Sequence, residues 1–236
     1  MMLKGRTAIV TGGTRGIGRA IAERLLSEGV GVAICGRSGS AVKKSVVEMG
    51  HAGKGKICGI EVDVSKLDEV RRLFAFAARE LGGLDILINN AGMLVLRSVA
   101  EMEPNDWQRS IETNLGGVFY CCHEALSLFR QRGGGFIINI SSLLGKTAVA
   151  GGAAYCASKF GVNGFSEALL LDHRRENVGV CTILPGSVNT ELFGTPADSN
   201  WKIQPEDVAQ VVVSVLTMPS RTLISRIEMR PLKPSK

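Results

Sequence analysis

Short apolar runs, most of them rich in β-branched residues, alternate with longer amphipathic stretches along the whole chain. The runs lie at Thr7–Thr11, Val30–Cys35, Ile57–Val64, Leu84–Ile88, Phe136–Ile140, Val178–Leu184 and, more weakly, Leu223–Met229. Strands that are apolar along their whole length are typical of a parallel sheet covered on both faces. The alternation therefore predicts the α/β class, with a doubly wound parallel sheet of about seven strands and helices on both faces.

The length of the chain favours one domain. At 236 residues and 45% hydrophobic composition, the chain can form one large core but is short for two. We expect residues 1–236 to form a single domain that carries every site, with Pro231–Lys236 as a loose end. The six cysteines lack the C-x-x-C spacing of zinc sites, which indicates reduced, mostly buried thiols and no metal site.

Charge and hydropathy exclude several function classes. The net charge of +6 is spread along the chain and forms no basic block or helix face, so we predict no nucleic-acid partner. A modest positive field suits an anionic cofactor equally well. Neither a signal peptide nor an apolar run of membrane-spanning length is present, and we expect a cytoplasmic protein without a membrane partner.

Two helices are expected to frame the functional site. One begins near Pro104, where Trp107, Ile111 and Leu115 recur every four residues and predict a single apolar face. The other covers Ala154 to about Arg174 and is rich in alanine and leucine.

A glycine-rich turn joins the first expected strand to the first helix. It contains Thr11, Gly12, Gly13, Thr14, Arg15, Gly16, Ile17 and Gly18. Such a turn lets the backbone approach a pyrophosphate, while the free N–H groups of the following helix bind the anion. Because the turn follows a strand and opens a helix, it predicts dinucleotide binding in a Rossmann-type sheet more strongly than an unliganded turn.

The end of the second strand indicates which dinucleotide is bound. A carboxylate there would bind the ribose 2′-hydroxyl of NAD, but the sequence reads Cys35-Gly36-Arg37-Ser38. A guanidinium at Arg37 suits a 2′-phosphate, and Arg15 is a second candidate. We therefore predict NADP in preference to NAD, although both arginines are also consistent with solvated surface charges.

A tyrosine and a lysine lie one helical turn apart after the fifth strand. Tyr155 and Lys159 share a helix face, with Cβ atoms about 5–6 Å apart. A free phenol has a pKa near 10, and a neighbouring ammonium favours its ionised form. We predict that Tyr155 is the acid-base for a carbonyl or alcohol and that Lys159, together with the positive ring of an oxidised nicotinamide, lowers its pKa. Ser142, at the carboxyl end of a strand, would stabilise the substrate oxygen.

These motifs together resemble the short-chain dehydrogenase/reductase family, including its NADP-dependent carbonyl and 3-oxoacyl-carrier-protein reductases. The resemblance extends from the first strand to about Thr190 and rests on the glycine turn, Asp63-Val64, Asn89-Asn90-Ala91-Gly92, Asn114, Ser142, Tyr155 with Lys159, and Pro185-Gly186 with Thr190. Taken singly, several of these motifs are equally consistent with ordinary turns, strand ends or helix residues.

The resemblance implies roles for these residues. Ser142, Tyr155 and Lys159 would be catalytic together with Asn114, whose backbone would hold a water that links Lys159 to a proton relay. Lys159 would also bind the nicotinamide ribose. Further cofactor contacts would come from Asp63, Val64, Asn90, Ala91, Gly92, Pro185, Gly186, Val188 and Thr190.

Two segments depart from the family pattern. Many of the family's reductases end in a Thr-Gly turn and an Asp-Gly-Gly tail, whereas this chain ends in Ser225–Pro231 and beyond. The segment 191–203, where the family has its substrate lid, is short. Both departures fall where the family binds its substrate and forms part of its subunit interface, so the resemblance identifies neither the substrate nor that part of the interface.

The sequence thus predicts an NADP(H)-dependent oxidoreductase that acts on a small carbonyl or secondary alcohol. The alternative is a non-catalytic NADP(H)-binding redox sensor or assembly partner. The resemblance also implies self-association to a dimer or tetramer, for which Phe119, Phe129, Phe160 and Phe165 offer apolar material, although these side chains suit an internal core equally well.

Overall fold

The computed structural model describes residues 3–51, 53–193 and 200–233. Its centre is a seven-stranded sheet in the order β3-β2-β1-β4-β5-β6-β7, in which every neighbouring pair is parallel. The predicted doubly wound parallel sheet is therefore confirmed. The strand order reverses between β1 and β4, which is where such sheets open a crevice at their carboxyl ends.

The strands follow the expected apolar runs with small shifts at their ends. They are β1 (Thr7–Thr11), β2 (Gly31–Gly36), β3 (Ile57–Glu61), β4 (Ile86–Asn89), β5 (Gly135–Ile140), β6 (Val178–Pro185) and β7 (Arg226–Met229). The third and seventh strands are shorter than the sequence predicts. Val62 and Val64 lie after the end of β3 and are buried, so their apolar character reflects core packing.

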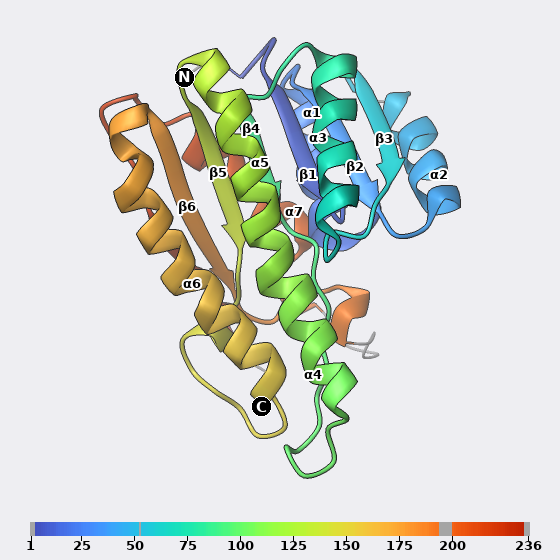
Figure 1. Ribbon diagram of the computed structural model, residues 1–236, viewed down its shortest axis with the longest axis vertical. Coiled ribbons are helices and arrows are strands. Elements are labelled where there is room, and N and C mark those ends of the chain that lie inside the picture. Colours follow the sequence, from blue (N-terminus) through green and yellow to red (C-terminus); the bar gives the residue numbers. More distant parts are fainter. Residues whose placement is uncertain (1–2, 52, 194–199, 234–236) are drawn as a thin grey trace.

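Helices cover both faces of the sheet (Figure 1). One layer contains α1 (Gly16–Ser27), α2 (Gly39–Gly50) and α7 (Pro205–Leu216), and the other contains α3 (Leu67–Leu81), α5 (Gly117–Arg132) and α6 (Ala153–His173). The short α4 (Pro104–Ile111) continues through a π-helical turn, Glu112–Gly116, into α5. In Figure 1, α5 and α6 lie in front of the sheet.

The strand side chains alternate between two hydrophobic cores. Ile88 and Ile138 belong to the cluster under α1 and α7, whereas Leu87 and Ile137, one residue earlier, belong to the cluster under α3, α5 and α6. This alternation follows from the two-residue period of a strand. Because both faces are dry, the sheet needs apolar residues at nearly every position, which is the pattern the sequence shows.

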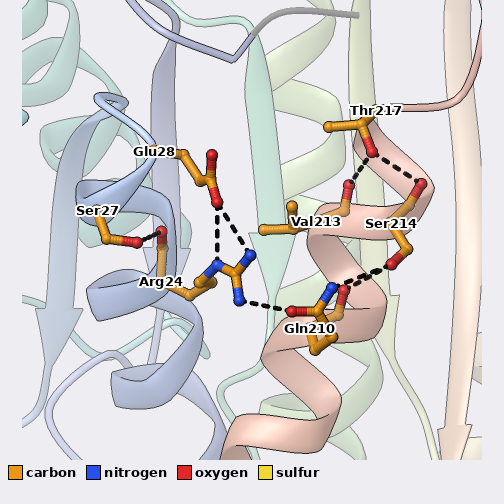
Figure 2. Close-up of polar contacts among 7 residues, drawn as sticks. All are labelled: Arg24, Ser27, Glu28, Gln210, Val213, Ser214 and Thr217. Carbon is orange, nitrogen blue, oxygen red and sulfur yellow. Dashed lines mark hydrogen bonds and ion pairs between the residues drawn. The ribbon is translucent and has the colours of Figure 1, made fainter.

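Polar contacts join α1 to α7 across one face (Figure 2). Arg24 donates to Glu28, one turn later in α1, at 3.0 Å and also to Gln210 of α7. Beside it Leu25 is fully buried in the core shared by the two helices. The packing of α1 against α7 therefore combines an apolar contact with a solvent-exposed polar one.

The helix that begins at Pro104 differs from its prediction. Pro104 occupies the first turn as expected, and Trp107, on the face predicted from the four-residue spacing, is 43% exposed. The π-helical turn from Glu112 adds a residue to one turn and changes the register of the faces after Ile111.

The six cysteines are all free and buried, as predicted. Burial raises the pKa of several of these thiols, to about 12 for Cys35 and Cys122. Among the described residues, no helix combines the length and hydropathy needed to span a bilayer.

The α1–α7 packing gives a first testable prediction. Leu25→Ala should lower the free energy of unfolding by about 2–5 kcal/mol, because it removes apolar contacts and leaves a cavity. The neighbouring Arg24→Ala should lower it by about 1 kcal/mol or less, because exposed ion pairs contribute little. Urea unfolding of both variants measures the difference. Equal losses would contradict this account of the packing.

Candidate active site

The glycine turn after β1 adopts backbone conformations that require glycine. Gly12 and Gly16 have φ values of 63° and 53°, in the left-handed region. At Gly18, a Cβ atom would lie 3.0 Å from the carbonyl carbon of Gly12, so a side chain there would push the turn open. The first turn of α1 has no side-chain cap and no acidic residue, which leaves its N–H groups available to an anion.

The segment after β4 is tied to the same turn. The side-chain hydroxyl of Thr11 accepts hydrogen bonds from the backbone N–H groups of Asn90 and Ala91, both at 3.0 Å. The Asn90 amide donates to the carbonyls of Thr11 and Gly12 at 3.0 and 3.2 Å. In this structure, the Asn90 side chain holds the glycine turn in place.

A cleft of about 440 Å³ opens at this switch point. Of the cofactor residues predicted from sequence, it is lined by Gly12, Thr14, Arg15, Gly16, Ile17, Arg37, Ser38, Asp63, Val64, Asn90, Ala91, Gly92 and Thr190. Gly18, Pro185, Gly186 and Val188 do not line it, nor do Ser142, Asn114, Tyr155 and Lys159. Most of these lining residues are those predicted to contact the adenosine and the pyrophosphate of the cofactor.

Met93 and Thr113 line the cleft although the sequence did not predict them, and Glu191 and Leu192 line it from the segment predicted as the substrate lid. Thr113 directly precedes the predicted Asn114, which is the only signal the sequence offers for it. Met93 enters because its backbone is bound to Asn114, a contact between residues far apart in sequence.

Two arginines contribute positive charge to the cleft. Arg15 donates to Glu191 at 2.6 Å, and both side chains are exposed. Arg37, also exposed, has no hydrogen bond or ion pair within the described part of the chain. Ser38 accepts a hydrogen bond from the N–H of Ala41 and so caps α2. Arg37 is therefore the cation more readily available to a ligand phosphate.

Asp63 is already engaged in the local turn after β3. It accepts hydrogen bonds from the backbone N–H and the hydroxyl of Ser65, at 3.0 and 2.8 Å. This arrangement fixes the carboxylate at the rim of the cleft. A glycine cradle, an uncapped helix N-terminus and a free guanidinium in one cleft fit a phosphorylated dinucleotide.

Ser142, Tyr155 and Lys159 come together at the carboxyl end of β5. Ser142 is the second residue after β5, and the other two lie one turn apart in α6. All three are buried, with exposed fractions of 7%, 4% and 5%. Ser142 is hydrogen-bonded to Tyr155, and the Lys159 Nζ lies 5.8 Å from the centre of the Tyr155 ring.

In the chain without cofactor, burial decides the direction of the Tyr155 pKa shift. Burial raises its pKa to about 12, and the hydrogen bond with Ser142 only partly offsets this effect. Burial also lowers the pKa of Lys159 to about 8. The Lys159 ammonium donates to the carbonyl of Ile140 at 2.9 Å. Because the predicted fall in the Tyr155 pKa needs an oxidised nicotinamide beside Lys159, it stays a prediction for the chain without cofactor.

Asn114 lies in the π-helical turn and is completely buried. Its side-chain oxygen accepts from the N–H of Met93 at 2.8 Å, and its amide donates to the Met93 carbonyl and to the hydroxyl of Ser158 at 3.0 Å. The amide therefore ties the segment after β4 to the turn of α6 that lies between Tyr155 and Lys159. No pattern in the sequence predicts this π-helical turn, a feature often found at functional sites.

The segment after β6 reaches both ends of the site. The N–H of Gly186 donates to the carbonyl of Met229 at 2.9 Å, and Val188 pairs with Ile203. The side chain of Thr190 lies against the glycine turn at Gly16. The predicted lid, 191–203, begins and ends among these contacts, but its part 194–199 lies outside the described residues.

Comparisons with known proteins agree with this geometry. A family model described as short chain dehydrogenase matches residues 6–200. An uncharacterized oxidoreductase of Staphylococcus aureus (strain MRSA252) is 31% identical over 233 residues, which cover 98% of this chain and 99% of that protein. A 3beta-hydroxysteroid dehydrogenase of Mediterraneibacter gnavus is 39% identical over 188 residues, covering 78% of this chain and 66% of that protein.

Two solved structures share the architecture. The crystal structure of a metagenomic short-chain oxidoreductase in complex with NADP has a TM-score of 0.87 and 32% identity, covering 99% of this chain and 100% of that chain. An alcohol dehydrogenase from the archaeon Thermococcus sibiricus, complexed with 5-hydroxy-NADP, has a TM-score of 0.90 at 23% identity, covering 98% of this chain and 99% of that chain. At that identity, the second likeness concerns the fold alone.

The buried lysine gives a pH-dependent prediction. In the unfolded chain the pKa of Lys159 is near 10.4, and burial lowers it to about 8 in the folded chain. Between these values the unfolded state binds more protons, so Lys159 makes the fold more stable as pH rises. From pH 8 to pH 10, the free energy of unfolding of the wild type should rise by about 2 kcal/mol relative to Lys159→Met.

Urea unfolding of the wild type and Lys159→Met at both pH values isolates this contribution, because other titrating groups are common to the two chains. Lys43→Met, at an exposed position in α2, serves as the control and should track the wild type. The same pH slope for the wild type and Lys159→Met would contradict the burial of an unneutralised ammonium.

Proposed function

Since the chain belongs to the short-chain dehydrogenase/reductase family, we propose that it is an NADP(H)-dependent oxidoreductase acting on a carbonyl or secondary alcohol. The observation that carries this proposal is the buried Ser142–Tyr155–Lys159 cluster, at the same edge of the sheet as the glycine-lined cleft. The bound nicotinamide would supply the hydride in reduction and accept it in oxidation.

Tyr155 is the proton donor in reduction and the proton acceptor in oxidation. Its phenol hydroxyl would give its proton to the substrate oxygen, while the Ser142 hydroxyl donates a hydrogen bond to the same oxygen. Burial keeps the phenol protonated at neutral pH, which suits a proton donor. Oxidation needs the phenolate, and its pKa must then fall through positive charge near the ring.

Lys159 supplies part of that charge. With a pKa of about 8 it is predominantly protonated at pH 7, and its Nζ already lies over the Tyr155 ring. It would also bind the nicotinamide ribose. The backbone at Asn114, in the π-helical turn, would hold the water that connects Lys159 to a proton relay.

The preference for NADP rests on Arg37. The end of β2 carries no carboxylate to bind a ribose 2′-hydroxyl, and the free Arg37 guanidinium suits a 2′-phosphate. The metagenomic relative in complex with NADP supports the same choice. Asp63 and Val64 would contact the adenine, and Pro185, Gly186, Val188 and Thr190 the nicotinamide end.

We also propose that residues 1–236 form one domain, which carries both cofactor and substrate sites, with 191–203 as a short substrate lid. Self-association to a dimer or tetramer is supported by the exposed side chains of Phe119 in α5 and Phe160 in α6, at 48% and 45% exposure. Phe129 is buried and belongs to the internal core, and Phe165 packs edge-on against Phe119.

Removal of the phenol hydroxyl tests the proton-transfer role. Tyr155→Phe should lower kcat for NADPH-dependent ketone reduction by roughly 100-fold or more, because a general acid contributes that much to the rate. Binding of NADPH, followed by its fluorescence, should persist. Turnover of Tyr155→Phe at the wild-type rate would refute the mechanism, and cofactor binding without turnover of any carbonyl by the wild type would refute the enzyme proposal.

Removal of the guanidinium tests the cofactor preference. Arg37→Gln should weaken NADPH binding by roughly tenfold or more and leave NADH binding unchanged, because only NADPH carries the 2′-phosphate. Lys43→Gln, which removes an exposed charge outside the cleft, is the matched control. Equal effects on the two cofactors would show that Arg37 does not contact the 2′-phosphate.

A further inference from the structure

A second cavity, of about 510 Å³, lies at the edge of the sheet opposite the cofactor cleft. It is formed where β4, β5 and β6 begin, beneath the end of α7 and the loop that leads to β7. In Figure 1 this is the upper edge, from which β5 and β6 run downward. The two cavities share no lining residue, so this one is separate from the proposed oxidoreductase site.

The inner wall of this cavity is apolar. It includes Leu3, Ile86, Phe136, Val178, Leu216 and Leu223. Gly179 shapes the wall, because a Cβ atom there would lie 2.7 Å from the Phe136 ring and 3.4 Å from Leu223. The volume falls within the range of small-molecule pockets in proteins.

Three arginines line the same cavity, Arg6, Arg132 and Arg174, with Asp85 as the one carboxylate. Asp85 is already satisfied, since it accepts from the N–H and hydroxyl of Thr7 at 2.8 and 2.9 Å and from Arg132 at 3.3 Å. The guanidinium groups of Arg6 and Arg174 have no hydrogen bond or ion pair to any residue in the described ranges.

The half-buried position of Arg6 indicates why the excess of positive charge in the cavity points to an anionic ligand. Arg6 is half-buried in the wall of the cavity, beside the buried Leu3 and Thr7. A guanidinium that is partly removed from water without a counter-charge destabilises the fold, unless an anion binds to it. The cavity therefore combines an apolar interior with the half-buried Arg6 and the exposed Arg174, two cations of the type that holds a carboxylate through paired hydrogen bonds.

We propose that this cavity binds an amphipathic organic acid, with its carboxylate held by Arg6 and Arg174 and its apolar body against Phe136 and Leu223. The apolar wall accounts for the body of the ligand, and the excess of guanidinium over carboxylate accounts for its charge. This cavity shares no lining residue with the cofactor cleft, so the ligand proposal does not depend on the oxidoreductase proposal.

Isothermal titration calorimetry with octanoate, on the full chain, tests the proposal. The wild type should bind octanoate saturably at one site, and 1-octanol, which has the same length without the charge, should bind at least about tenfold more weakly. Arg6→Gln and Arg174→Gln should each weaken octanoate binding by roughly tenfold or more. Arg175→Gln removes the same charge one residue away, outside the cavity, and should bind octanoate as the wild type does.

Three outcomes would overturn the proposal. Octanoate could fail to bind saturably, or it could bind equally well to the Arg6→Gln/Arg174→Gln double variant, which would place it elsewhere, such as in the oxidoreductase site. Sedimentation could also show that the double variant changes the oligomeric state while the wild type binds no octanoate. In that case a second copy of the chain covers the cavity.

Discussion

The structure depends on a parallel sheet whose two faces are both kept from water. Because all seven strands point the same way, their carboxyl ends meet at one edge. That edge holds the glycine turn after β1, Asn90 after β4 and Ser142 after β5. The hydrophobic layers thus bring together residues that are far apart in sequence, and the chemistry follows from where the strands end.

The same burial determines the electrostatics of the proposed catalytic cluster. Removal of water disfavours the charged forms of both Tyr155 and Lys159, so the phenol is less acidic and the amine less basic than in solution. Without cofactor, the Tyr155 phenol is therefore protonated, which suits a proton donor but not a proton acceptor. In our proposal the oxidised nicotinamide, which is positively charged, completes the site for the reverse direction.

The sequence predicts the fold and the position of the glycine turn well, because both depend on local patterns. Apolar runs reveal strands, and Gly12, Gly16 and Gly18 occupy positions where a side chain would be strained or would clash. Tyr155 and Lys159 could be placed on one helix face from their spacing alone, although their roles remain proposals.

Other features could not be read from the sequence, because they depend on contacts made only after folding. The sign of the Tyr155 pKa shift is set by burial, and the Lys159 ammonium turns to the Ile140 carbonyl. The π-helical turn and the hydrogen bonds of Asn114 to Met93 and Ser158 join three separate segments. No sequence pattern predicts the second cavity, since its arginines come from three distant parts of the chain.

The most direct test of the account is the ionisation of Tyr155 with and without oxidised cofactor. The chain contains two tyrosines, so the phenolate absorbance of the wild type minus that of Tyr155→Phe isolates this residue. At a pH of about 10, where a free phenol is half ionised, we predict no Tyr155 phenolate without cofactor and clear phenolate absorbance with saturating NADP⁺. A phenolate signal that is already present without cofactor, or that stays absent when NADP⁺ is bound, would contradict the account.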